Sequence, residues 1–176
     1  MLVAASDLEV ADDLKKYDLK MTHNIPDPWT MQVDESFILE FVITNTNPVT
    51  NLEFDIGEML GHADAVTFGK PAVSFGEAYR HDDPVDTAEF EGKLIHLDPV
   101  VSNTGVYYIA QKKAQQPKLL GKSIQRRKFR ILALLNTEAT RDVANADNQV
   151  QIHFKMALSL VIPLFSDNCK GSSKNG

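Results

Sequence analysis

An unbroken alternation of apolar residues near the C-terminus constrains the fold of this chain more than any other feature. Eight consecutive even-numbered positions are apolar: Val150, Ile152, Phe154, Met156, Leu158, Leu160, Ile162 and Leu164. Successive side chains of a β-strand point to opposite faces, so this pattern predicts a strand with one buried face. At ~3.3 Å per residue the strand would be about 50 Å long, and we expect it either to bend across a corner or to pair partly with another chain.

Shorter segments repeat the same alternation along the chain. Residues 36–44, 105–110 and 128–135 each predict a strand, and residues 49–56 predict the hairpin partner of 36–44 across an Asn-Thr-Asn-Pro turn. No segment with helical periodicity separates these strands, which argues against alternating βαβ units. We therefore expect an all-β fold, a single antiparallel β-sandwich of the jelly-roll or immunoglobulin-like kind.

The two ends of the chain differ from the middle. Ser6-Asp-Leu-Glu9 matches a helix capping box and predicts a short N-terminal helix over residues 7–17. Two prolines within Ile25-Pro-Asp-Pro28 predict an extended linker after it. The expected organisation is a helix and linker arm at 1–28, a β-sandwich domain at 29–165 with a long C-terminal strand, and a disordered polar tail at 166–176.

Charge is unevenly distributed along the chain. The net charge of −6 combines a balance of −14 over residues 1–98 with one of +8 over residues 99–176. Between Pro99 and Thr137 there is no acidic residue. The same stretch holds eight bases, here called the basic strip: Lys112, Lys113, Lys118, Lys122, Arg126, Arg127, Lys128 and Arg130. We take these eight residues as the candidate binding residues.

The basic strip has three interpretations. It could be a solvated segment whose charge the acidic N-terminal half compensates within one molecule. It could be an assembly surface that meets the acidic part of another copy or of another protein. It could also bind the phosphates of a nucleic acid, but the net negative charge of the whole chain disfavours that partner at long range. The expected partner is therefore the chain itself or another protein.

The sequence lacks the residue constellations of common enzymes. Its histidines have none of the close spacings of zinc sites, and its one cysteine, Cys169, lies in the polar tail. His96 with Asp98 could form an acid–base or ligand pair, which chance explains as easily. His81 with Asp82 and Asp83 could supply metal ligands, but a solvated acidic turn is the favoured interpretation. We predict no catalytic residues, no metal site and no cofactor.

The N-terminus shows no targeting signal. It has no basic region followed by a long apolar run, and no apolar segment approaches the ~18 residues of a membrane span. The expected location is the cytoplasm, or a particle assembled there.

These observations predict a non-enzymatic structural protein that self-associates or docks a partner through a polarised acidic and basic surface. A viral coat, matrix or movement-type protein would have such an architecture, although the analogy is one of architecture alone. Two alternatives stay open at this point. One is a monomeric immunoglobulin-like module that binds a peptide or cargo, and the other is a cupin-like or carbohydrate-active enzyme.

Overall fold

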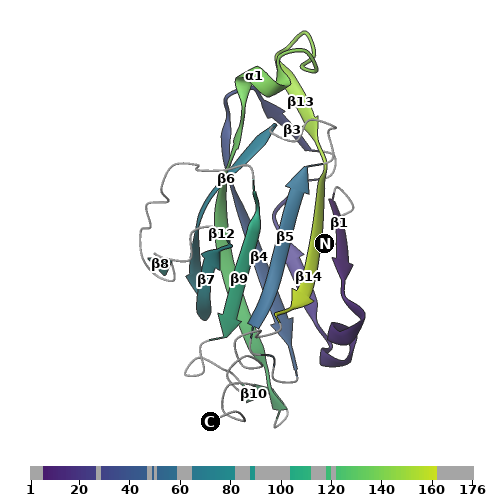
Figure 1. Ribbon diagram of the computed structural model, residues 1–176, viewed down its shortest axis with the longest axis vertical. Coiled ribbons are helices and arrows are strands. Elements are labelled where there is room, and N and C mark those ends of the chain that lie inside the picture. Colours follow the sequence, from purple (N-terminus) through teal and green to yellow (C-terminus); the bar gives the residue numbers. More distant parts are fainter. Residues whose placement is uncertain are drawn as a thin grey trace, which may run out of the picture.

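Two five-stranded β-sheets lie face to face and enclose the core (Figure 1). The computed structural model describes residues 6–26, 29–46, 49, 51–58, 65–81, 88–89, 104–111, 118–119 and 122–161. Sheet A contains, in spatial order, β1 (Ser6–Val10), β14 (Phe154–Leu160), β5 (Asn51–Glu58), β9 (Val106–Gln111) and β7 (Gly76–Arg80). Sheet B contains β2 (Lys20–His23), β4 (Ser36–Asn45), β12 (Gln125–Leu135), β6 (Val66–Ser74) and β8 (Ala88–Glu89).

Smaller elements lie at the ends of the sandwich. Two short strand pairs form, β13 (Gln149–Ile152) with β3 (Trp29–Gln32), and β10 (Lys118–Leu119) with β11 (Lys122–Ser123). The helical elements are the 3₁₀-helix η1 (Asp12–Tyr17) and the short helix α1 (Thr137–Thr140). In Figure 1, α1 and β13 mark one end of the molecule and β10 the other. The chain is all-β and sandwich-like, as expected, with β1–β14 and β6–β8 as parallel exceptions to antiparallel pairing.

Three phenylalanines from both sheets form the centre of the core. The ring centroid of Phe41 on β4 lies 4.9 Å from that of Phe54 on β5 and 5.1 Å from that of Phe129 on β12. The rings of Phe54 and Phe129 are 5.3 Å apart. All three side chains are fully buried. Their contacts join the two sheets, and each buried aromatic side chain contributes several kcal/mol, about 3–5 by truncation to alanine.

The predicted strands β4 and β12 are confirmed, but the predicted hairpin is wrong. β5 pairs with β14 and β9 in sheet A, whereas β4 pairs with β2 and β12 in sheet B. The turn between β4 and β5 therefore crosses from one sheet to the other. Both strands have a strongly apolar face, and facing each other across the sandwich buries both faces at once.

The predicted N-terminal helix is also wrong. Residues 6–10 form β1, which pairs in parallel with β14 from Ser6–Phe154 to Val10–Leu158. Only Asp12–Tyr17 is helical, and it is a 3₁₀-helix without a capping side chain. Pairing with the open edge of β14 satisfies backbone groups that a helix of about three turns would expose at its ends, so tertiary structure overrides the local capping signal. The segment predicted as an arm thus supplies an edge strand to each sheet, β1 to sheet A and β2 to sheet B.

The long C-terminal alternation is divided into two strands at His153. β13 pairs with β3 beyond the sandwich end, and β14 then joins sheet A. The even-numbered side chains from Val150 to Leu158 are buried throughout, so the period of two continues across His153. The two alternatives for this strand, a bend across a corner and pairing with another chain, both stay predictions. Residues 162–165 lie outside the described part of the chain.

Gly57 and Gly105 both lie in or next to a strand of sheet A, but the space around their Cα atoms differs. Gly105 precedes β9, and a Cβ placed there would overlap the carbonyl oxygen of Ile56 and lie 2.7 Å from Cγ2 of the same residue. Gly57 lies within β5, and a Cβ placed there would meet no atom within 4 Å. The first position requires glycine for close backbone approach, and the second does not.

We therefore expect Gly105→Ala to lower the free energy of unfolding by about 2 kcal/mol or more, because the backbone of β5 must shift. Gly57→Ala is the matched control and should change it by less than about 1 kcal/mol. Urea unfolding followed by circular dichroism measures both. Equal effects of the two substitutions would contradict the close approach of β9 to β5.

His23 couples the edge strand β2 to the protonation state of one side chain. Its Nδ1 accepts a hydrogen bond from the backbone N–H of Ile25 at 3.1 Å, and its ring lies edge-on to Phe41. Burial lowers the pKa of His23 below its ordinary value of about 6.5. As pH falls through that value, the unfolded chain binds a proton that the folded protein resists, so stability is lost on the acid side.

The free energy of unfolding of the wild type should consequently fall faster than that of His23→Gln as the pH drops below about 6.5. Urea unfolding at a series of pH values from about 7.5 to 5 gives the two curves. Parallel curves would show that His23 contributes nothing to the pH dependence.

Candidate functional site

Sheet A presents a face that is mainly acidic. Within β5, Leu52, Phe54 and Ile56 point into the core, so Glu53 and Asp55 point outward. Glu9 lies opposite Ala157 on the same side, and Glu77 lies opposite Ala110. Lys155 is a basic side chain among them. We call this surface the acidic face and define it by Glu9, Glu53, Asp55 and Glu77.

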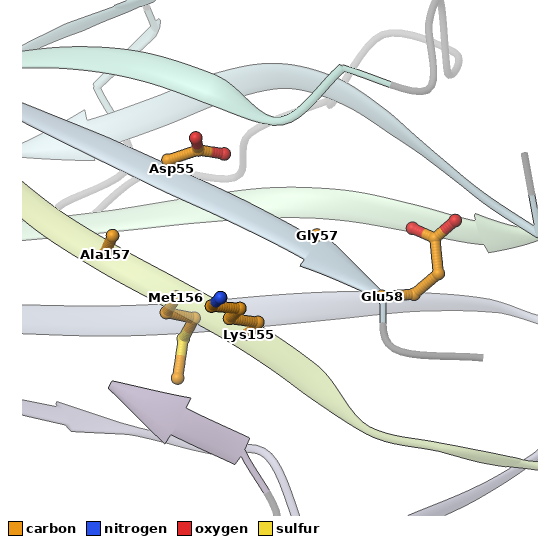
Figure 2. A pocket seen from close by; sticks show the side chains of 6 residues that line it. All are labelled: Asp55, Gly57, Glu58, Lys155, Met156 and Ala157. Atoms are coloured by element: carbon orange, nitrogen blue, oxygen red, sulfur yellow. The ribbon is translucent and has the colours of Figure 1, made fainter. Parts of the chain in front are cut away.

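A shallow hollow lies on the acidic face between β5 and β14 (Figure 2). It has a volume of about 280 Å³ and is lined by Asp55, Gly57, Glu58, Lys155, Met156 and Ala157. Gly57 lacks a side chain that would fill it. Two carboxylates against one ammonium group give the hollow a negative balance, which suits a basic side chain rather than an anion.

An aromatic cluster borders the acidic face on β7 and β9. Tyr108 lies directly opposite Glu53, and its ring centroid is 5.4 Å from that of Tyr79. The hydroxyl of Tyr108 shares a hydrogen bond of 2.9 Å with Nδ1 of His81. Partial burial, and then the negative charge of Glu53, raise the pKa of the Tyr108 hydroxyl. The neighbouring Tyr107 points inward and donates a hydrogen bond to the carbonyl of Gly69, so only one tyrosine of the pair faces solvent.

Sheet B presents the opposite charge. Phe129 and Ile131 of β12 point into the core, so Arg126, Lys128 and Arg130 point outward at every second position. Lys20 on β2 is exposed in the same cross-strand row as Arg126, because both pair with Thr44. We call this surface the basic face and define it by Lys20, Arg126, Lys128 and Arg130.

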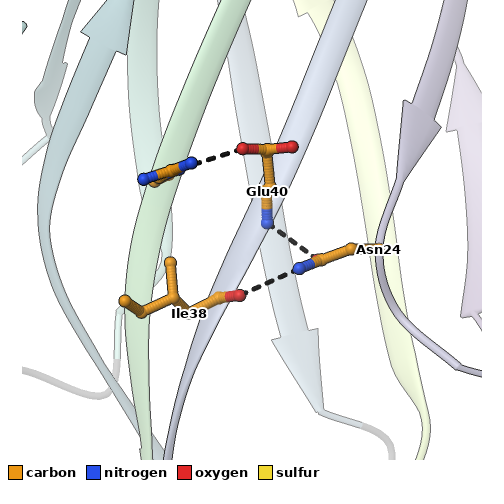
Figure 3. Close-up of polar contacts among 4 residues, drawn as sticks. Asn24, Ile38 and Glu40 are labelled. Carbon is orange, nitrogen blue, oxygen red and sulfur yellow. Dashed lines mark hydrogen bonds and ion pairs between the residues drawn. The ribbon is translucent and has the colours of Figure 1, made fainter. Parts of the chain in front are cut away.

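One carboxylate interrupts the basic face. Glu40 on β4 accepts a hydrogen bond of 2.9 Å from Nε of Arg130, which neutralises that pair (Figure 3). The backbone of Glu40 is held by Asn24, whose Oδ1 accepts from the N–H of Glu40 at 2.8 Å while its Nδ2 donates to the carbonyl of Ile38 at 3.0 Å. Arg126 and Lys128 lie nearer the start of β12.

The structure separates the eight residues of the basic strip. Arg126, Lys128 and Arg130 share the basic face, whereas Arg127 points into the interior. Lys118 and Lys122 lie on β10 and β11, which pair with each other outside the two large sheets. Lys112 and Lys113 lie outside the described residues. An acidic surface was expected from the sequence, but its residues were not named, although the alternation of Glu53 and Asp55 with apolar residues was a readable signal.

Arg127 is a buried cation at the end of the sandwich. It is 0% exposed, and its Nη2 donates a hydrogen bond to the carbonyl of Val49 in the turn between β4 and β5. Among the described residues, its Nε and Nη1 have no hydrogen-bond partner. Burial lowers the pKa of Arg127 to about 10, so it is still charged at neutral pH. Gln125 holds the same turn, since its Oε1 accepts from the N–H of Val49 at 2.7 Å and from Nδ2 of Asn45 at 2.6 Å. Arg127 thus acts on the fold and is not available at the surface.

The three histidines in the described part of the chain lie on different elements. His23, His81 and His153 lie on β2, after β7 and between β13 and β14. No group of three or more His, Cys, Asp or Glu among the described residues is placed to hold a metal ion. His96, Asp98, Asp82, Asp83 and Cys169, which the sequence singled out, lie outside those residues. The two charged faces are accordingly the candidate site.

Comparisons with known proteins do not add a function to this geometry. Neither the protein-family models nor the curated proteins include a match to this chain. Within the described residues, no helix has both the length and the apolar character needed to cross a membrane.

Proposed function

We infer that this protein is a non-enzymatic building block that associates with further copies of itself through its two charged faces. One observation supports this most directly: acidic and basic side chains point away from opposite sides of the same sandwich. The protein therefore carries both halves of a complementary contact, and no second protein is needed to supply either. Complementary charge steers encounter and fixes the register of association.

Self-association explains both faces, whereas nucleic-acid binding explains only one. A polyanion would gain from Arg126 and Lys128, but Glu40 lies within the same face and the net charge of −6 repels phosphate at distance. The acidic face would have no role in that complex. Self-association gives both faces a role, because the acidic face of one copy attracts the basic face of its neighbour.

Apolar side chains on the basic face provide a second contribution. Ile38 on β4 is 45% exposed, and Leu132 and Leu134 on β12 are partly exposed on the same side. Their burial in an interface would be favourable at about 25 cal/mol per Å² of apolar surface. Charge alone would give a weaker contact, since exposed ion pairs are worth about 0–1 kcal/mol each.

The size of the faces sets the expected strength. Five strands at ~4.8 Å spacing and about seven residues at ~3.3 Å give a face of roughly 24 by 23 Å, or about 550 Å² per partner. The total of about 1,100 Å² lies at the low end of specific interfaces, where association is commonly weak. We therefore expect assembly that depends strongly on protein concentration and on ionic strength.

Light scattering tests the proposal. In about 0.1 M salt, the mean particle mass should exceed that of the 19.6 kDa monomer and rise with protein concentration. In about 1 M salt, where the Debye length falls to ~3 Å, the mass should return toward the monomer. A monomer at high protein concentration in low salt would refute self-association and favour the monomeric binding module. Retention on a DNA duplex under conditions in which copies do not associate would favour the nucleic-acid interpretation instead.

A further inference from the structure

The charged side chains on the two faces have the same spacing and the same position in their sheets. β5 is the third of five strands in sheet A, and β12 is the third of five in sheet B. Glu53 and Asp55 are two residues apart on β5, and Arg126 and Lys128 are two residues apart on β12. Both pairs are thus separated by ~6.6 Å along the central strand of a face. Two acids can meet two bases without a change in either backbone.

We propose that Glu53 and Asp55 of one copy bind Arg126 and Lys128 of the next copy, so that the contact is head-to-tail. This inference rests on the self-association proposed above and adds its partner residues and its symmetry. The acidic and basic faces lie on opposite sides of one sandwich, so an assembly of two copies still presents one open face of each kind, at its two ends. Such a heterologous contact extends into a chain, or closes into a ring if the rotation permits.

Side chains around the two pairs favour this arrangement. The guanidinium of Arg126 lies 5.5 Å from the ring centroid of Phe75, which restrains it at the surface. Next to Glu53, Tyr108 and Tyr79 offer aromatic faces to an incoming cation. An arginine that reaches this position would meet a carboxylate and an aromatic ring together, which is a favourable setting for a planar guanidinium.

A symmetric dimer is the competing geometry. Pairing two acidic faces would place Glu53 and Asp55 against like charges, and pairing two basic faces would do the same for Arg126 and Lys128. Like-charge juxtaposition across an interface costs several kcal/mol. The apolar side chains on the basic face, Ile38 above all, are the one feature that would favour a symmetric contact.

Two neutralised variants distinguish these geometries. E53Q/D55N removes the charges of the acidic pair, and R126Q/K128Q removes those of the basic pair, with little change in side-chain size. We expect each variant alone to show an association constant lowered by about tenfold or more. In an equimolar mixture, the intact basic face of the first should bind the intact acidic face of the second. That complex should stop at one copy of each, because its two outer faces are neutralised.

Matched controls use charged residues away from both faces. Glu138 and Arg141 are exposed at α1 and the turn that follows it, so E138Q and R141Q change the net charge by the same sign without touching either face. Both should assemble as the wild type does. The fourfold exchange E53K/D55K/R126E/K128E should regain salt-sensitive assembly, since the two contacting pairs exchange signs and still attract each other. Sedimentation velocity gives the species, and circular dichroism melting verifies the fold of every variant.

The possible results distinguish the head-to-tail contact from self-association in general. If the folded wild type is monomeric in low salt, both the self-association and the head-to-tail contact are refuted. If the wild type assembles and one face variant assembles equally well, the self-association stands and the head-to-tail contact is refuted. If the equimolar mixture yields only monomers, the contact lies elsewhere on the molecule. Discrete one-to-one complexes in the mixture, with recovery in the fourfold exchange, support the pairing.

Discussion

Contact between the phenylalanine rings of Phe41, Phe54 and Phe129 joins the two sheets, and the orientation of nearly every other side chain follows from it. These rings come from β4, β5 and β12, so burying them places the alternate residues of the same three strands outside. A slip of one residue in any of these strands would send its charged residues into the core and its aromatic ring into water. The charge on each outer face is therefore a direct consequence of the packing between the sheets.

The arrangement of charge in space differs from its arrangement along the chain. The acidic N-terminal half supplies β1, β5 and β7 to sheet A, but it also supplies β2, β4, β6 and β8 to sheet B. The basic face stays positive because Glu40 is the single acidic residue of β4 and the central strand β12 comes from the acid-free stretch. Likewise, the acidic face stays negative because β14, from the basic half, contributes just Lys155 to it. Strand order converts a polarity along the sequence into a polarity across the sandwich.

Sequence alternation predicted the central strands well, but it did not predict which strands pair with each other. β4, β9 and β12 were found because a period of two is a local property of each segment. The assignment of β5 to β4 failed because a hairpin turn and a crossing between sheets have similar turn residues. The N-terminal strand β1 was not predicted, because its formation depends on pairing with β14, some 150 residues away. Among the candidate site residues, Arg127 was grouped with its neighbours by charge, although adjacent residues of a strand face opposite ways.

Arg127 shows that inward and outward positions serve different purposes in this protein. Lowering its pKa to about 10 corresponds to a cost of about 3 kcal/mol for holding the charge in the interior. Its hydrogen bond to the carbonyl of Val49 helps to fix the connection that carries the chain from β4 in sheet B to β5 in sheet A. The free-energy cost of burying the charge is therefore offset in part by this contact. Arg126 and Lys128 lie on the outer side of the same sheet and are not buried in this way. Surface charges of that kind contribute about 0–1 kcal/mol each to folding. Their charge is therefore constrained far less by the fold than by whatever the outer face meets, which is why the opposite charges on β12 and β5 are informative about a partner.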